Sequence, residues 1–345
     1  MKKTKTIRDS RFELLRIFAM ILIIMHHFAC HGGWVIQDGT SAINQAILDF
    51  FVIGGKIGVN VFVLISGYFL VTSKFKWQKI LKLIVQLSFY TIIIYLILVS
   101  CGQITFTLPA FIKTIFPIIF FENWFMTYYA ILFCLSPFLN ILIKKMDSKQ
   151  YLLLIIFLIV LQTILPYILG NEHLAKAFCF ITLYLIAGYI KLYPNKFFDS
   201  FKLNISIFIV TFLGIAILYI FANYNAWNMT HLLCILCSIS MFLTFKNMKE
   251  FRSNTLNLVS STTLGIYLIH DNKYFSSILW QDILNCPAHL SFAPLQFITF
   301  AICSVIVVFV VCALIELLRQ EIFNGIEKIY LKIKTSKKIN ANENQ

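Results

Sequence analysis

Five ionisable side chains lie within one apolar segment near the start of the chain. Residues 12–31, FELLRIFAMILIIMHHFACH, include Glu13, Arg16, His26, His27 and His31. An ionisable side chain in hydrocarbon costs roughly 2.5 to 3.5 kcal/mol on insertion scales, so residues of this kind usually have a function. Arg16 and His27 share one stripe of a helix, because the step between them makes three turns plus about 20°. The rise between them is about 16 Å, half the apolar thickness of a bilayer, and the pair indicates chemistry inside a membrane.

The residues around this pair divide into partners and competitors. Glu13 falls about 60° from Arg16 on the helix, so we expect the two to form an i, i+3 ion pair. His26 competes with His27 for a catalytic role, but it lies about 100° around the helix and should face a different neighbour. Only His27 shares the stripe of Arg16 and is therefore the predicted catalytic imidazole. His31 is assigned to the outer membrane interface.

The rest of the chain must supply the helices that position this segment. The 345 residues are 59% hydrophobic and 13% charged, with a mean hydropathy of +0.83, whereas soluble domains carry about 25% charged residues. We therefore predict an all-α polytopic membrane protein, because helices satisfy their own backbone hydrogen bonds in lipid. About ten transmembrane helices are expected, over residues 12–31, 53–72, 80–100, 124–143, 151–169, 175–192, 205–222, 229–245, 258–275 and 295–316. The apolar segment 108–121 is short and contains proline, so we expect it to be re-entrant or interfacial.

The basic residues are sorted to one side of the predicted helices. If the N-terminus is cytoplasmic, 25 of the 29 Lys and Arg residues fall on the cytoplasmic side. The four others are Lys56, Lys113, Lys176 and Lys273. The positive-inside rule thus explains the net charge of +14, and nucleic acid is not an expected partner. Both termini are predicted to be cytoplasmic, with an integral membrane domain over 1–318 and a basic, polar tail over 319–345.

Three further segments combine small, aromatic or ionisable residues. Residues 54–70, GGKIGVNVFVLISGYFL, contain glycines and Ser66, which allow a helix or a ligand to approach the backbone closely. Trp124 and Tyr128 begin a span at the outer face, where they form either an aromatic belt or a platform for sugar stacking. Residues 264–272, LGIYLIHDN, contain Tyr267 and place His270 and Asp271 at the outer end of another span. For His270, ordinary interfacial placement remains an alternative to a functional role.

These segments resemble, in their order, the motifs of the membrane acyltransferase-3 family, which are integral membrane O-acyltransferases of the cell-surface polysaccharide type. Arg16 followed by ten residues and His27 is similar to the R/K-x10-H motif of the first helix. GVNVFVLISGYFL resembles the signature of the second helix, and LGIYLIH resembles a late G-x-Y-L-x-H element. The resemblance runs from residue 8 to about residue 316 and agrees with the predicted number of spans.

The resemblance implies transfer of an acyl group, usually acetyl, from cytoplasmic acyl-CoA to a hydroxyl of a cell-surface or secreted glycan. It implies a catalytic site of His27, Arg16 and Glu13, in which His27 is a general base or an acyl carrier. Acetyl-CoA or another acyl-CoA is then expected at Arg16, Lys79, Lys82 and Ser66, and the acceptor at Trp124, Tyr128, His270 and Tyr267. No metal is expected. The expected partners are a glycan or lipid-linked sugar, membrane lipids and other polysaccharide-assembly proteins, in the plasma membrane of a bacterium.

One departure and three alternatives accompany this interpretation. The family often has an arginine-rich motif after the second span, where this chain has Lys76, Lys79 and Lys82, and lysine lacks the bidentate grip of arginine on phosphate. A transporter or flippase of lipid-linked sugars is the main alternative. Such a protein usually spreads ionisable residues over several helices, whereas here they are concentrated in the first. A different class of membrane acyltransferase and a catalytically inactive relative are the other two.

Overall fold

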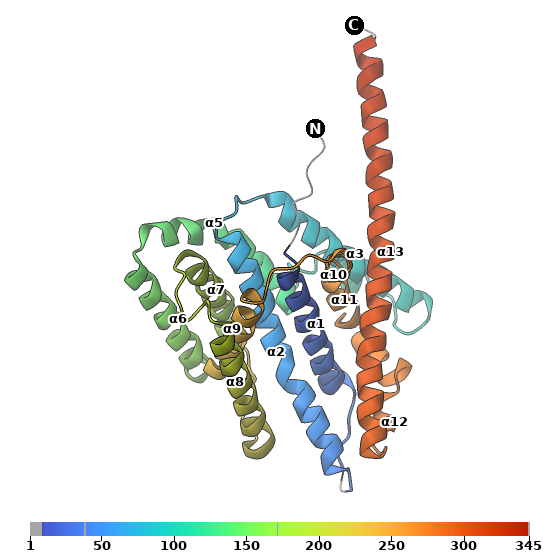
Figure 1. Ribbon diagram of the computed structural model, residues 1–345. Helices are drawn as coiled ribbons and strands as arrows, with labels where there is room; N and C mark the ends of the chain where they lie inside the picture. The colour runs from blue at the N-terminus through green and yellow to red at the C-terminus, as the bar shows by residue number, and fades with distance from the viewer. Residues whose placement is uncertain (1–8, 38, 171, 344–345) are drawn as a thin grey trace.

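A bundle of helices forms the body of the protein (Figure 1). The computed structural model describes residues 9–37, 39–170 and 172–343, and this part of the chain contains no strand. The helices are α1 (Ser10–His31), α2 (Ala42–Leu70), α3 (Trp77–Ser100), α4 (Leu108–Ile115), α5 (Trp124–Lys145), α6 (Ser148–Leu169), α7 (Glu172–Leu192), α8 (Phe201–Ala222), α9 (Leu232–Lys246), α10 (Asn254–Ser260), α11 (Thr263–His270), the π-helix η1 (Ile278–Ile283), α12 (Cys286–His289) and α13 (Pro294–Glu343).

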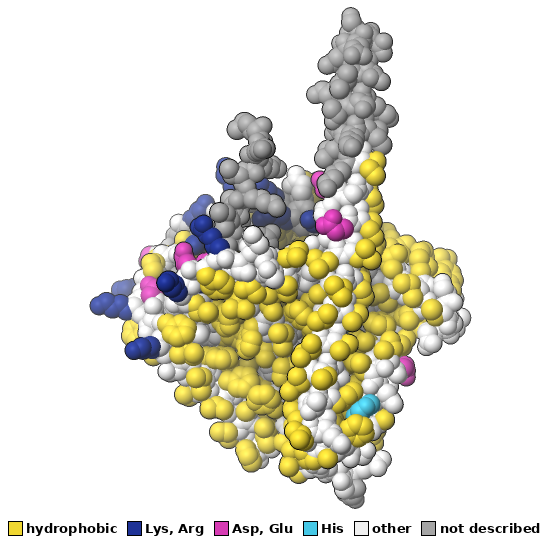
Figure 2. All heavy atoms as spheres, turned by 45° about the vertical axis from the view of Figure 1, so that its right-hand side comes forward, with side chains coloured by type: hydrophobic (Ala, Val, Ile, Leu, Met, Phe, Trp, Pro, Cys, Tyr) yellow, Lys and Arg dark blue, Asp and Glu magenta, His cyan; other side chains and the backbone are white. Residues whose placement is uncertain are grey.

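Several of these helices are long and apolar enough to cross a membrane. Within the described residues there are seven, namely α1, α2, α3, α5, α7, α8 and the Pro294–Glu327 part of α13, and shorter apolar helices cover Ser148–Ile164 and Leu232–Lys246. In Figure 2 hydrophobic side chains cover the flank of the body, while Lys and Arg gather at the end from which α13 extends. The prediction of an all-α polytopic membrane protein is confirmed.

Polar caps mark where several helices begin. The side chain of Asp9 accepts a hydrogen bond from the Arg11 backbone N–H at the start of α1, and Asn123 accepts one from Met126 at the start of α5. Such caps satisfy backbone donors that have no partner within the helix. At its other end, α8 stops at Asn223, which adopts the left-handed conformation that commonly follows a helix.

The predicted span over 258–275 is wrong as a single helix. The chain instead forms two short helices, α10 and α11, separated at Ser261 and Thr262. Both hydroxyls at the break hydrogen-bond to carbonyls three residues earlier, from Ser261 to Leu258 and from Thr262 to Val259. Side chains of this type compete with the backbone bonds of a helix, and hydropathy alone does not register that competition.

The segment predicted to be re-entrant or interfacial forms α4, which has only eight residues. It packs against α3, where the Thr91 hydroxyl donates to the Thr114 carbonyl at 2.7 Å. The expectation that this segment does not form a full span agrees with that length.

Close packing of α1 against α2 sets the centre of the bundle (Figure 1). Three glycines of α2 face α1: Gly54 faces the Leu22 side chain, Gly55 the His26 ring and Gly58 the Ala19 carbonyl. Small residues let two helix backbones approach closely in a membrane, where no hydrophobic effect drives them together. Of the two explanations for the glycine-rich segment, helix packing accounts for these three glycines.

The last helix continues beyond the bundle. α13 runs from Pro294 to Glu343 (Figure 1) and passes residue 318 without interruption. The predicted boundary between domain 1–318 and tail 319–345 therefore falls inside a helix, and that division remains a prediction. Four basic residues of the sorted set, Lys2, Lys3, Lys5 and Arg8, lie outside the described residues, as do Asn344 and Gln345.

We predict that Gly55→Ala destabilises the protein. The added methyl would overlap the Cβ and Cγ atoms of His26, so α1 and α2 would have to separate, at a cost of about 1–3 kcal/mol. Thermal unfolding in detergent should show a lower midpoint. The matched control is Gly214→Ala on α8, where nothing lies within 4 Å of the new Cβ. It should be at least as stable as wild type, because alanine favours helices. Equal losses in both variants would contradict close α1–α2 packing.

Candidate active site

A cavity of about 260 Å³ lies beside α1 and is bounded by α2, α3, α5 and the α10–α11 pair. From α1 it is lined by Glu13, Arg16, Met20 and Ile23. These residues recur every three or four positions, so they form one stripe of the helix, and His27 is the next residue of that stripe. Most of the wall is apolar, whereas Glu13, Arg16 and the hydroxyls of α10 and α11 make one end polar.

Arg16 and Glu13 form the ion pair that their spacing predicts. One Arg16 guanidinium nitrogen donates to Glu13 Oε1 at 2.7 Å, and the Ser260 hydroxyl donates to the other carboxylate oxygen. The Glu13 side chain is 6% exposed and that of Arg16 is 27% exposed, so the carboxylate is enclosed while the guanidinium reaches the cavity. Glu13 thus orients Arg16 and ties α1 to α10.

Ser66 and Tyr267 line the same cavity. The Tyr129 hydroxyl donates to Ser66 Oγ at 3.1 Å, and the Ser66 hydroxyl donates to the Phe62 carbonyl at 2.8 Å. The Tyr267 hydroxyl donates to Asn123 Oδ1 at 3.2 Å. The Tyr267 ring also lies 6.4 Å from the His27 ring, measured between centroids. Tyr267 therefore connects the cavity to the imidazole of His27.

His27 and His270 form a hydrogen-bonded pair. His27 Nδ1 lies 2.9 Å from His270 Nε2, and His270 Nδ1 lies 2.6 Å from the Ile266 carbonyl oxygen. Because a carbonyl only accepts, His270 carries its proton on Nδ1, and its Nε2 then accepts a proton from His27 Nδ1. A neutral His27 therefore has its free lone pair on Nε2. That is the arrangement a general base needs, with a second group holding its ring.

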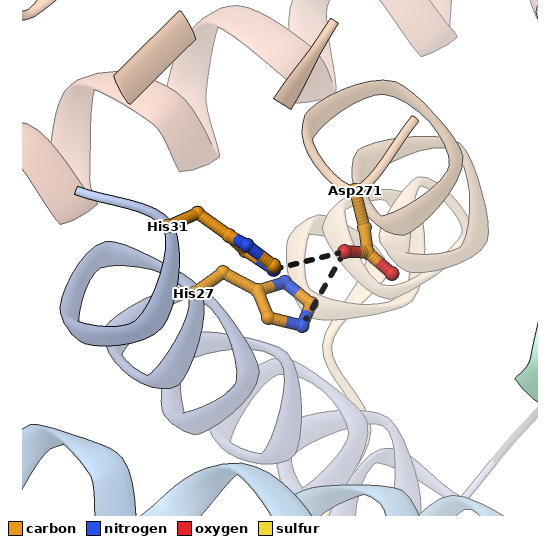
Figure 3. Close-up of side chains that lie close together, drawn as sticks. All are labelled: His27, His31 and Asp271. Atoms are coloured by element: carbon orange, nitrogen blue, oxygen red, sulfur yellow. Dashed lines mark ion pairs between the residues drawn. The ribbon is translucent and has the colours of Figure 1, made fainter. Parts of the chain in front are cut away.

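The lone pair of His27 faces a carboxylate (Figure 3). Asp271 Oδ1 lies 3.5 Å from His27 Nε2 and 3.6 Å from His31 Nε2. A carboxylate at this distance stabilises an imidazolium, so Asp271 would favour the protonated form of His27 that follows proton abstraction. The sequence predicts His31 at the outer membrane interface and Asp271 at the outer end of a span, and it indicates a catalytic role for neither. Their meeting depends on how α11 packs on α1, which spacing along the chain does not show.

His26 has a different environment from His27, as predicted. His26 Nδ1 lies 2.7 Å from the Val52 carbonyl of α2, and its ring packs edge-on against Trp227 at 5.5 Å. These contacts hold α1 against α2 and against the chain before α9.

Five of the predicted binding residues do not line the cavity, namely His270, which bonds to His27, and Lys79, Lys82, Trp124 and Tyr128. Lys79 and Lys82 are exposed at the start of α3, about one turn before and directly before Leu83, which lines the cavity. Tyr128 is buried, and its hydroxyl donates to the His173 carbonyl at 3.0 Å. Trp124 packs on Phe125 and Tyr128, and the ammonium of Lys56 lies 4.7 Å from its ring centroid. The binding roles of all the predicted residues, those that line the cavity included, remain predictions.

A second buried ion pair, which is not among the predicted site residues, lies on α13. Arg319 donates twice to the Glu316 carboxylate, at 2.8 and 2.6 Å, and the Tyr90 hydroxyl and the Gln86 amide of α3 also donate to it, at 2.5 and 3.2 Å. The carboxylate packs against Gly265 of α11, where a Cβ would overlap it. The network thus holds α3, α11 and α13 together. The sequence pattern that could have indicated this ion pair is a glutamate within an apolar helix, followed three residues later by an arginine.

We predict that Glu316→Leu is strongly destabilising. It would leave the guanidinium of Arg319 buried without its partner, which costs about 3–5 kcal/mol. The double variant Glu316→Leu/Arg319→Leu should be more stable than the single one, because replacing a whole buried pair by apolar residues is often nearly neutral. Thermal unfolding in detergent compares the two. A double variant less stable than the single would contradict this account of the network.

A comparison with protein families identifies the family of this chain. Residues 9–317 match the profile of the acyltransferase-3 family, described as an acyltransferase domain. The matched region contains α1 with Arg16 and His27, α11 with His270, and Glu316 of α13. Neither a curated protein sequence nor a solved structure shows significant similarity to the chain. Because the family match covers most of its length, the chain belongs to the membrane acyltransferase-3 family.

Proposed function

We propose that this membrane acyltransferase moves an acetyl group from cytoplasmic acetyl-CoA to a hydroxyl of a cell-surface or secreted glycan, in the plasma membrane of a bacterium. The observation that carries the proposal is the single stripe of α1. Along it Glu13 and Arg16 form the polar end of a cavity, and His27 follows one turn beyond Ile23, the last α1 residue that lines that cavity. The family match favours acyl transfer over the alternative of a lipid-linked sugar flippase.

The shape and charge of the cavity support a CoA thioester as the donor. A space of about 260 Å³ with mostly apolar walls suits a thin, flexible chain such as the pantetheine arm better than a whole nucleotide. Arg16 stands at its polar end, and the exposed Lys79 and Lys82 lie close by along α3. Their positive charge would attract the polyanionic nucleotide outside the cavity. The acyl end of the arm would then point toward Tyr267 and His27.

The imidazole pair supports base catalysis at the far end of this path. His270 accepts a hydrogen bond from His27 Nδ1 and so holds the ring of His27. His27 Nε2 would then accept the proton of the acceptor hydroxyl while the hydroxyl oxygen attacks the thioester carbonyl. Asp271 would stabilise the imidazolium that forms. When the C–S bond breaks, the leaving thiolate takes that proton and departs as CoA thiol, so no other reactant is needed. Tyr267 lines the cavity and its ring centroid lies 6.4 Å from that of His27, so the acyl group would approach His27 beside this ring.

The distribution of charge supports the orientation that this reaction requires. In Figure 2 Lys and Arg gather at the end of the bundle from which α13 extends, and Figure 1 shows that α1 begins at that same end. Positive residues favour the cytoplasm, where acyl-CoA is made, and the imidazoles then lie toward the outer face, where a surface glycan is exposed. A lipid-linked sugar or a growing polymer would reach the site from that side, together with other proteins of polysaccharide assembly.

We predict that His27→Ala lowers acyl transfer by about 10²- to 10⁴-fold, the usual contribution of a general base. The matched control is His26→Ala, which removes the adjacent imidazole. It should retain transfer activity because His26 bonds to Val52 of α2 and does not face the cluster of His27, His270 and Asp271. Acetylation of surface glycan by intact membranes measures both. If His26→Ala abolished transfer and His27→Ala did not, the assignment of the base would be wrong.

We predict that Arg16→Ala weakens CoA binding, because a buried charge contact of this kind is worth roughly 2 to 5 kcal/mol. Arg16→Lys should restore binding only in part, since lysine lacks the planar fork of arginine. The measurement is the rise in unfolding temperature on adding CoA to each purified variant. Comparing each variant with and without CoA separates binding from its own stability. An equal rise in wild type and Arg16→Ala would exclude Arg16 from the donor site.

A further inference from the structure

Three potential metal ligands meet at the outer end of α1. His27 and His31 project from successive turns of the helix, and Asp271 faces both from the residue after α11 (Figure 3). One nitrogen of each imidazole and one carboxylate oxygen all lie within 4.8 Å of one another. Two histidines at an i, i+4 spacing on one helix face are a common metal-binding arrangement, and a carboxylate from another element completes a three-residue set.

We propose that His27, His31 and Asp271 form a binding site for a divalent transition-metal ion of the zinc type. Ligands about 2.0–2.2 Å from a tetrahedral zinc ion are themselves about 3.4 Å apart. The two distances from Asp271 Oδ1, 3.5 Å to His27 Nε2 and 3.6 Å to His31 Nε2, are close to that value. The Asp271 oxygen therefore already lies at a ligand–ligand distance from both imidazoles, whose ligand nitrogens lie within 4.8 Å of each other, and side-chain rotations would bring all three onto the ion.

The hydrogen bonds made by the proposed ligands on their far sides are also typical of a metal site. The other ring nitrogen of a metal-bound histidine usually donates to an acceptor, which fixes the tautomer and the ring orientation. His27 Nδ1 has such an acceptor in His270 Nε2 at 2.9 Å, and His270 is itself held by the Ile266 carbonyl. For His31, the backbone carbonyl accepts from the Gln281 amide at 3.1 Å, which holds this end of α1 against η1.

Three protein ligands leave one coordination position of a tetrahedral ion open, as in metal sites that bind a further small ligand. The ion would use the Nε2 lone pair of His27, which is the lone pair that the proposed transfer reaction needs. Metal binding and base catalysis at His27 therefore exclude each other. Zinc at the outer face is expected to inhibit the enzyme, and this consequence, unlike the binding itself, rests on the proposed function.

Zinc binding by the purified full chain tests the site without using the reaction. The protein, freed of any histidine tag and stripped with a chelator, is titrated with Zn²⁺ in competition with a chromogenic chelator. Wild type should bind one high-affinity zinc per chain. His31→Ala and Asp271→Asn should each bind at least tenfold more weakly. His31→Cys, which replaces one zinc ligand by another, should restore most of the affinity.

The matched control is His289→Ala. His289 lies on the same side of the bundle but stacks on Phe300, with ring centroids 3.8 Å apart, and is not part of the cluster. Its removal should leave zinc affinity unchanged. Wild type without a stoichiometric zinc, or a His31→Ala affinity equal to that of wild type, would overturn the proposal. Failure of His31→Cys to bind better than His31→Ala in folded protein would also overturn it.

Inhibition separates this inference from the proposed function. If wild type binds zinc and loses transfer activity with the same concentration dependence, both stand. If zinc binds and transfer is undiminished, the metal site stands, and His27 does not act through its free lone pair. If wild type binds zinc but transfers no acyl group even after chelation, only the proposed function fails.

Discussion

The cost of leaving a charge without a partner in an apolar bundle is the constraint on which the structure depends. An ionisable group in hydrocarbon is tolerated when it is paired or hydrogen-bonded. Glu13 is bonded to Arg16 and Ser260, Glu316 to Arg319 and two donors of α3, and His27 to His270. Each of these contacts lies within the bundle, and most of them join two helices. The two ion pairs form within single helices, and the further hydrogen bonds to each buried carboxylate come from a neighbouring helix, so satisfying these groups fully requires the tertiary structure.

These pairs place α10 and α11 alongside α1. Ser260 at the end of α10 bonds to Glu13, and His270 at the end of α11 bonds to His27, so the broken helix pair follows α1 from one end of the site to the other. The break between α10 and α11 lies between these two contacts. Glu316 supports α11 from its other side through Gly265. The geometry at His27 therefore depends on α13 as well as on the helix that carries it.

The side chains of His27, His31 and Asp271 at the outer end of α1 could support two kinds of chemistry, proton transfer and metal binding. An imidazole held at Nδ1 presents its Nε2 lone pair, and that lone pair takes a proton or a metal ion equally well. Asp271 favours both outcomes, because it stabilises an imidazolium and is itself a ligand. The glycines of α2 let α1 pack closely on that side, while His26 bonds to Val52 of α2. That contact holds the helix so that His27 turns toward α11.

The sequence by itself determined the membrane class, the stripe of Arg16 and His27, the Glu13–Arg16 pair and the different surroundings of the two adjacent histidines. All of these follow from composition or from the geometry of a single helix, which is set by residues a few positions apart. Only the tertiary structure decided that His270 holds His27, that Asp271 meets His31, and that the late span is broken. It also decided that Arg319, assigned to the tail, is buried beside Glu316. Contacts between α1 and α11 join residues more than two hundred positions apart, and hydropathy and spacing do not state which helix faces pack together.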